Sequence, residues 1–231
     1  MALSLVVKIV YDVILWLVVF FPSAVIGAAL GTRLSQGPRE KLVAGTFTQV
    51  MFLVLSLIAA YLAGIEGVVS YYVDRGVLVI GLYSFSVFLV ISVLVNYVSA
   101  RLVQGDEVAP ISSEALEEDK ALALLSLVLL APLGEETLFR GLAEGYLMES
   151  HEPLSVTILL PALLFAIVHI GPLNRRKLLL VEVFLVGILL GYLRVMTASL
   201  IPVVVSHSAM NIGSLVFRLL NSPPVASQGR V

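Results

Sequence analysis

The chain lacks cysteine altogether and carries few charged residues for its length. The 231 residues include no cysteine, which excludes disulfides, thiolate metal sites and a cysteine nucleophile. Charged residues make up 13% of the chain, against about 25% in ordinary soluble domains. The net charge is −2, and no basic stripe indicates binding of nucleic acid. Hydrophobic residues reach 59%, too many for a soluble fold of this length to bury, so the sequence predicts a polytopic membrane protein.

The sequence shows no internal repeat, and its first apolar run lacks the pattern expected of a cleavable leader. The missing repeat counts against a transporter built from inverted repeats. The first apolar run starts near Ser4 and is longer than the core of a signal peptide, so we predict a retained first span.

Apolar runs of membrane length divide the chain into seven predicted spans. They lie near 4–30, 43–65, 76–99, 120–148, 153–171, 177–195 and 199–220. We expect an all-α polytopic membrane protein whose seven or so transmembrane helices enclose an intramembrane polar cavity. Residues 1–231 form a single predicted transmembrane domain. It divides into three spans and an acidic loop over 1–119, a four-helix portion over 120–220 and a short tail over 221–231.

Lysine and arginine are distributed unevenly between the two ends of the predicted spans. Only basic residues are counted, because acidic ones contribute little to membrane orientation. Ten fall on one side and three on the other. The larger set is Arg33, Arg39, Lys41, Arg101, Lys120, Arg175, Arg176, Lys177, Arg218 and Arg230, and the smaller set is Lys8, Arg75 and Arg194. The bias predicts an outward N-terminus and a cytosolic C-terminus.

Four ionisable side chains fall inside the predicted spans: Glu135, Glu136, His169 and His207. An Asp, Lys or Arg at the centre of a membrane helix costs ~2.5–3.5 kcal/mol on insertion scales, so ionisable residues at such positions mark functional sites. A glutamate pair with two histidines is typical of hydrolytic chemistry. The four-helix portion is therefore the predicted catalytic part.

The fourth span contains the glutamate pair, just after Pro132 and Gly134, which predict a kink or a half-helix there. Glu136 and Arg140 are four residues apart on one helical face and are expected to form an ion pair. Glu135 lies about 100° around the helix and has no partner within it. An unpaired carboxylate in a low-dielectric site is suited to act as a general base.

The fifth and seventh spans each add a polar pair with helical spacing. Phe165 lies one turn before His169, and His207 lies one turn before Asn211. We expect Glu135 and His169 to activate a water molecule. His207 and Asn211, two donors one turn apart, are suited to stabilise the oxyanion that forms when an amide is attacked.

The three motifs Glu-Glu-x-x-x-Arg, Phe-x-x-x-His and His-x-x-x-Asn, in this order on successive spans, resemble the CAAX-protease and bacteriocin-processing superfamily. This superfamily of intramembrane proteases includes Rce1-type enzymes, which remove the last three residues of prenylated proteins. The resemblance implies that Glu135 and His169 activate the water, that His207 and Asn211 form the oxyanion hole, and that Glu136 and Arg140 support them. It also implies a membrane-associated or lipidated peptide substrate, which reaches an active site open to the cytosolic side.

Two alternatives remain open from the residues themselves. Glu135 with the two histidines could hold zinc in a metallopeptidase, although His-Glu-x-x-His is absent. We favour the mechanism without a cofactor because of the family resemblance. A non-enzymatic protein is the other alternative: a proton-coupled transporter that uses the same residues as a relay, or an immunity protein.

Three further patterns predict local contacts. Asp12 lies one turn after Lys8, which predicts an ion pair in the first span. Glu144 lies one turn after Arg140 and is expected to share its charge. Gly187 and Gly191 form a small-xxx-small pair, which is typical of close helix packing.

Overall fold

A computed structural model describes residues 2–65, 67, 69–102, 119–170 and 177–221, and within these ranges it contains helices and no strands. Seven helical segments follow one another: α1 (Ala2–Leu34), α2 (Pro38–Leu62), α3 (Arg75–Leu102), a composite fourth segment (Lys120–Glu149), α8 (Leu154–Val168), α10 (Lys177–Thr197) and α11 (Ile201–Asn221). They correspond one by one to the seven predicted spans, so the all-α fold class is confirmed. The predicted acidic loop and tail, apart from Asp119 and Asn221, lie outside the described residues.

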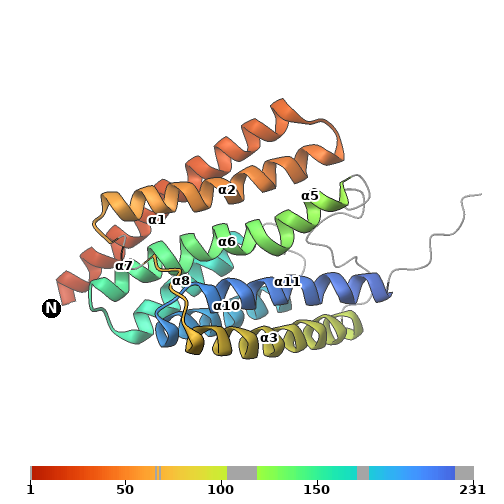
Figure 1. Ribbon diagram of the computed structural model, residues 1–231. Coiled ribbons are helices and arrows are strands. Elements are labelled where there is room, and N and C mark those ends of the chain that lie inside the picture. Colours follow the sequence, from red (N-terminus) through yellow and green to blue (C-terminus); the bar gives the residue numbers. More distant parts are fainter. Residues whose placement is uncertain (1, 66, 68, 103–118, 171–176, 222–231) are drawn as a thin grey trace, which may run out of the picture.

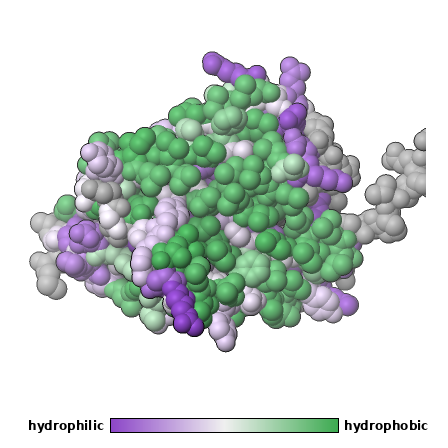
Figure 2. All heavy atoms as spheres, in the orientation of Figure 1, coloured by the Kyte–Doolittle hydropathy of each residue, from purple (hydrophilic) through white to green (hydrophobic). Residues whose placement is uncertain are grey.

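Six of these segments are long and apolar enough to cross a membrane. The exception is α8, whose 15 residues rise about 22 Å, less than the ~30 Å of a bilayer's hydrocarbon core. Figure 2 shows apolar side chains over most of the visible face, with the strongly hydrophilic ones near its margins. The protein is an integral membrane protein, and the predicted orientation of its termini stays a prediction.

The fourth segment lies between two groups of helices (Figure 1). On one side, α1 packs against α2, and glycines allow the close approach: a Cβ on Gly31 would lie 2.5 Å from the Cβ of Ala44. On the other side, α3 packs against α11, and α10 packs against α8. The site residues on the fourth segment are therefore enclosed by helices from both halves of the chain.

Two apolar clusters hold these groups together. The first joins α1, α2, the fourth segment and α8, and includes Trp16, Val19, Phe52, Leu138, Phe139, Leu142 and Phe165. The second joins α3, α10 and α11, and includes Phe88, Val186, Leu190, Val203, Ala209 and Met210. Lipid is as apolar as these side chains, so their close packing against one another, and not their removal from water, fixes the helices around the fourth segment.

The fourth segment is continuous but contains two stretches of π-helix. Its parts are α5 (Lys120–Leu125), the π-helical η2 (Ser126–Leu130), α6 (Ala131–Glu136), the π-helical η3 (Thr137–Ala143) and α7 (Glu144–Glu149). The kink or half-helix predicted at Pro132 thus takes the form of widened turns around α6. Proline has no N–H and its ring clashes with the carbonyl four residues earlier, which a widened turn relieves.

The loop between α2 and α3 packs against the start of α11. The carbonyl oxygen of Ser70 accepts the Leu200 N–H at 2.8 Å, and that of Tyr72 accepts the Ser199 hydroxyl at 2.6 Å. These bonds satisfy backbone groups that would otherwise be orphaned at a helix end. They also hold Tyr71 against the fourth segment.

The predicted Lys8–Asp12 ion pair is wrong. The Lys8 ammonium instead lies 2.7 Å from Glu152 Oε1 and donates to the Ser150 carbonyl oxygen at 2.8 Å. Glu152 and Ser150, on the turn after α7, therefore bind the Lys8 ammonium in place of Asp12, which is on the same helix as Lys8. Asp12 is fully buried, and neither of its oxygens has a hydrogen-bond partner among the described residues.

Candidate active site

Glu136 and Arg140 form the ion pair that their spacing predicts. Arg140 Nη1 lies 3.1 Å from Glu136 Oε2, and both side chains are fully buried. Arg140 Nη2 also donates to the Gly187 carbonyl oxygen at 3.0 Å, and the guanidinium lies over the Phe165 ring, 4.7 Å from its centre. Three different elements thus hold this arginine in a single orientation.

Gly187 and Gly191 make room for these buried charges, which adds to the close packing their spacing predicts. A Cβ on Gly187 would lie 3.3 Å from Arg140 Nη2, and one on Gly191 would lie 3.0 Å from Glu144 Oε2. Glu144 is fully buried and is attracted by both Arg140 and Arg194. The charge sharing expected between Arg140 and Glu144 stays a prediction, because neither Glu144 oxygen has a hydrogen-bond partner among the described residues.

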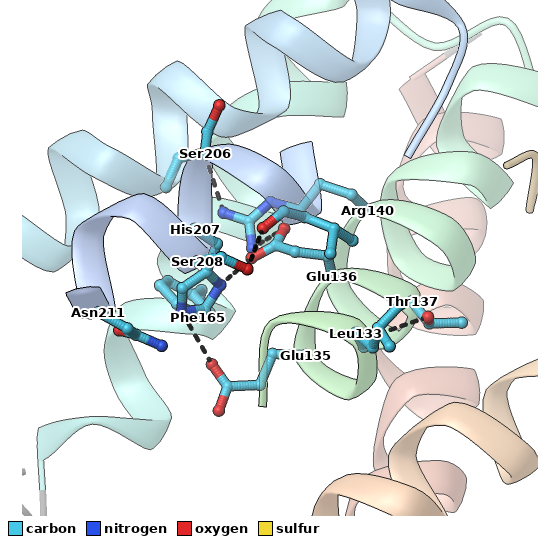
Figure 3. A network of polar contacts seen from close by, with 12 residues as sticks. Leu133, Glu135, Glu136, Thr137, Arg140, Phe165, Ser206, His207, Ser208 and Asn211 are labelled. Atoms are coloured by element: carbon cyan, nitrogen blue, oxygen red, sulfur yellow. Dashed lines mark hydrogen bonds and ion pairs between the residues drawn. The ribbon is translucent and has the colours of Figure 1, made fainter. Parts of the chain in front are cut away.

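His207 lies between the two glutamates (Figure 3). Its Nδ1 is 2.6 Å from Glu136 Oε1, and its Nε2 is 3.8 Å from Glu135 Oε2. A carboxylate accepts, so Nδ1 carries the hydrogen of the short bond. The longer separation exceeds a direct hydrogen bond. The spacing that placed His207 beside Asn211 did not indicate its bond to Glu136, because that bond crosses between helices.

Glu135 is held by Gln49, a residue that no sequence motif indicated. Gln49 Nε2, on α2, donates to Glu135 Oε1 at 2.9 Å. The two helices come close at this point because Gly134 has no side chain: a Cβ there would lie 2.3 Å from the Gln49 carbonyl oxygen. The available signal was an amide inside an otherwise apolar span, since polar groups there usually have partners.

His169 directly follows the last residue of α8 and turns back onto it. Its Nδ1 lies 2.7 Å from the Phe165 carbonyl oxygen, and the two rings are 4.6 Å apart. The Phe165 ring also lies 5.9 Å from the His207 ring, edge to face, so Phe165 contacts both histidines. Among the described residues, no hydrogen bond or ion pair joins His169 to Glu135.

Asn211 and Ser208 bind backbone carbonyls that η2 leaves without an α-helical partner. The Ala131 N–H bonds to Ser126 instead of Leu127, and Pro132 has no N–H to offer Val128. Leu127 O accepts the Asn211 Nδ2 at 2.9 Å, and Val128 O accepts the Ser208 hydroxyl at 2.7 Å. The widened turn before the glutamate pair thereby ties α11, with His207 and Asn211, to the fourth segment.

Tyr71 reaches the site from the loop between α2 and α3. Its hydroxyl bonds to Thr137 Oγ1, which itself donates to the Leu133 carbonyl oxygen at 2.5 Å. Burial raises the pKa of the Tyr71 phenol, so the group stays an uncharged donor. The bond anchors the loop beside Glu136, a contact that sequence spacing could not indicate.

The zinc alternative, with Glu135, His169 and His207 as ligands, stays a prediction. Glu135 Oε2 and His207 Nε2 lie 3.8 Å apart, and His169 Nδ1 bonds to the Phe165 carbonyl oxygen. In the described part of the chain, no group of three His, Cys, Asp or Glu side chains is placed so that it could hold a metal ion. No step proposed below runs through a metal.

These observations define an all-helical integral membrane protein with a buried site of two glutamates, an arginine and a histidine. Residues 117–213 match the family described as type II CAAX prenyl endopeptidase Rce1-like. The matched stretch contains every predicted site residue, and the match confirms the predicted resemblance and supports a CAAX-protease-like function in general. No curated protein and no solved structure matches the chain.

Proposed function

We propose that the protein is an intramembrane endopeptidase in which Glu135 activates water and a membrane-associated or lipidated peptide is the substrate. The observation that carries the proposal is that the two glutamates have different hydrogen-bond and ion-pair partners. Glu136 is bound by Arg140 and His207, whereas Glu135 keeps one oxygen, Oε2, without a hydrogen-bond partner among the described residues and facing His207 Nε2. Adjacent carboxylates with different surroundings are suited to different roles.

Water activation is the first step of the proposed reaction. A water molecule that donates to Glu135 Oε2 lies beside His207 Nε2, which is 3.8 Å from that oxygen and keeps its hydrogen for the oxyanion. Glu135 takes a proton from this water while the water oxygen bonds to the carbonyl carbon of the scissile amide. The carbonyl π electrons move onto its oxygen, which becomes an oxyanion.

His207 stabilises the oxyanion through its Nε2–H, while Glu136 holds the ring through Nδ1–H. As an imidazolium, His207 balances the charges of Glu135, Glu136 and Arg140, so the buried site has no net charge. Asn211 Nδ2 has two hydrogens and gives one to Leu127, which leaves the second for the oxyanion. Collapse of the intermediate breaks the C–N bond, and the proton on Glu135 passes to the leaving nitrogen.

His169 assists from the other side of Phe165. Because the Phe165 carbonyl can only accept, His169 Nδ1 carries a hydrogen, and Nε2 is the nitrogen left for water or substrate. That nitrogen can accept a hydrogen bond from the attacking water or from the substrate's amide. We assign His169 a supporting share in water activation, with Phe165 orienting both imidazole rings.

The short helix α8 supports access from one side of the membrane. Its 15 residues are too few to cross the hydrocarbon core, which would place His169, directly after it, within the membrane. With the orientation that the basic residues predict, the open side faces the cytosol. A lipidated peptide anchored in that leaflet can then reach the site laterally.

The test is cleavage of a fluorogenic farnesylated CAAX peptide by detergent-purified protein, with an unfarnesylated twin peptide alongside. Glu135→Gln keeps the size and the bond from Gln49 but removes the base, and should lower kcat by ~100-fold or more. Glu149→Gln is the matched control, because Glu149 is exposed at the end of α7. Full activity in Glu135→Gln would contradict the assignment of the base.

A further inference from the structure

The contact between α2 and the glutamate pair is closer than ordinary helix packing. With any side chain at position 134, the Cβ would lie 2.3 Å from the Gln49 carbonyl oxygen, so glycine is required for this approach. Position 134 immediately precedes Glu135. The glycine thus sets α2 at the depth where the Gln49 side chain can reach the carboxylate.

The Gln49 amide has one orientation that suits its surroundings. Nε2 donates to Glu135 Oε1 at 2.9 Å, while Oε1 points toward Gly134 and is buried without a hydrogen-bond partner in the described part of the chain. The reverse orientation would set the amide oxygen against a carboxylate oxygen, which repels. An unsatisfied buried acceptor is unfavourable, and here it accompanies a charge-assisted bond to Glu135.

We infer that Gln49 is a positioning residue for the proposed base: it holds Glu135 Oε1 so that Oε2 faces His207 and the attacking water. The inference rests on the proposed function. It also extends the site beyond the matched residues 117–213, because Gln49 lies on a helix of the N-terminal part. The alternative is a polar contact that only joins α2 to the fourth segment.

Three variants separate positioning from helix joining. Gln49→Met keeps the approximate size and removes the donor, and should lower kcat about 10- to 100-fold with little change in KM, because Glu135 loses its fixed geometry. Gln49→Glu keeps the shape but faces Glu135 with a second carboxylate, and should lower kcat further. Ser56→Ala is the control: it alters another buried polar residue of α2 and should leave kcat unchanged.

A double variant tests whether Gln49 acts through Glu135. In the Glu135→Gln background, Gln49→Met should lower the residual rate by less than 2-fold, because the carboxylate it positions is gone. If Gln49→Met lowered kcat by the same factor in the wild-type and the Glu135→Gln backgrounds, the positioning role would be overturned. A kcat for Gln49→Met equal to that of Ser56→Ala would also overturn it. If Gln49→Met is unfolded by size-exclusion chromatography, unchanged kcat in the isosteric Gln49→Glu overturns the inference.

Failure of the inference and failure of the proposed function give different results. If the wild-type protein cleaves neither peptide, the function itself is contradicted. If the wild type cleaves and Glu135→Gln does not, the function stands and the Gln49 variants alone decide the inference.

Discussion

The molecule buries acidic side chains in two regions, and only one of them supplies partners. At the site, Glu136 is fully buried between Arg140 and His207, and each of its oxygens faces a nitrogen within 3.1 Å. In α1, Asp12 is buried to the same extent without a hydrogen bond in the described part of the chain. The partners of Glu136 come from two further elements, η3 and α11, whereas no other element supplies a hydrogen bond to Asp12 in that part of the chain.

The difference shows that burial alone does not define a functional site. Removing an ionised group from water costs several kcal/mol, and that cost is recovered only where geometry and hydrogen bonds are good. The site meets this condition with four elements: α6, η3, α10 and α11. The free energy of unfolding should therefore fall when any partner of the paired charge at the site is removed. The unpaired acid in α1 has no partner to lose, so its own removal should not destabilise the protein.

The largest effect is expected when one partner of the paired glutamate is removed. Arg140→Met leaves Glu136 buried with an uncompensated charge and should destabilise the protein by about 3–5 kcal/mol, with loss of cleavage. Chemical unfolding in detergent micelles measures the first effect. Arg39→Met is the control, because Arg39 is exposed in its pair with Asp119 and should cost at most about 1 kcal/mol. Equal stability of the two variants would contradict the comparison.

A methyl group at Gly187 should have the next largest effect. Its Cβ would lie 3.1 Å from the Cβ of Ala162 and 3.3 Å from Arg140 Nη2, so α10 or the guanidinium must shift. Gly187→Ala should cost about 1–3 kcal/mol and lower kcat by displacing Arg140. At Gly45, a Cβ meets nothing within 4 Å, so Gly45→Ala should gain up to about 1 kcal/mol in helix propensity. If Gly45→Ala lowered the free energy of unfolding as much as Gly187→Ala, crowding at Gly187 would not explain the effect.

Replacement of the unpaired acid, Asp12, should not destabilise the protein. Asp12→Asn removes a carboxylate that has no hydrogen-bond partner among the described residues, so the free energy of unfolding should stay constant or rise by up to about 1 kcal/mol. Cleavage should be unchanged, because Asp12 does not contact the site. The thermal unfolding midpoint of the purified variant is the measurement. A drop in the midpoint would mean that the carboxylate stabilises the fold, and the contrast with Glu136 would be lost.

The helices could be predicted from the sequence because the bilayer demands long apolar runs, and the one short helix was still recognisable by its composition. Within one helix, spacing correctly placed Arg140 beside Glu136. The same rule failed for Lys8 and Asp12, because acceptors from outside the helix compete for the lysine. Spacing carries no information about such competitors.

Contacts between helices account for what the sequence could not predict at the site. The bonds of Gln49 to Glu135 and of Asn211 to Leu127 depend on the register between helices. That register depends on Gly134 and on the widened turns around Pro132, which change which face each residue presents. The sequence indicated a disturbance at Pro132, but its consequence for α11 follows only from the arrangement in space.

The smallest effect is expected at Lys8, whose pair with Glu152 lies near the surface. The Lys8 side chain is 34% exposed and that of Glu152 is 7% exposed, so solvent screens the pair from the lysine side. Lys8→Met should lower the free energy of unfolding by less than about 1 kcal/mol and leave cleavage intact. The loss should also shrink at high salt, because screening already weakens the wild-type pair. A loss comparable to that of Arg140→Met would mean that the turn after α7 is fixed mainly by this lysine. Burial would then not be what separates the two pairs.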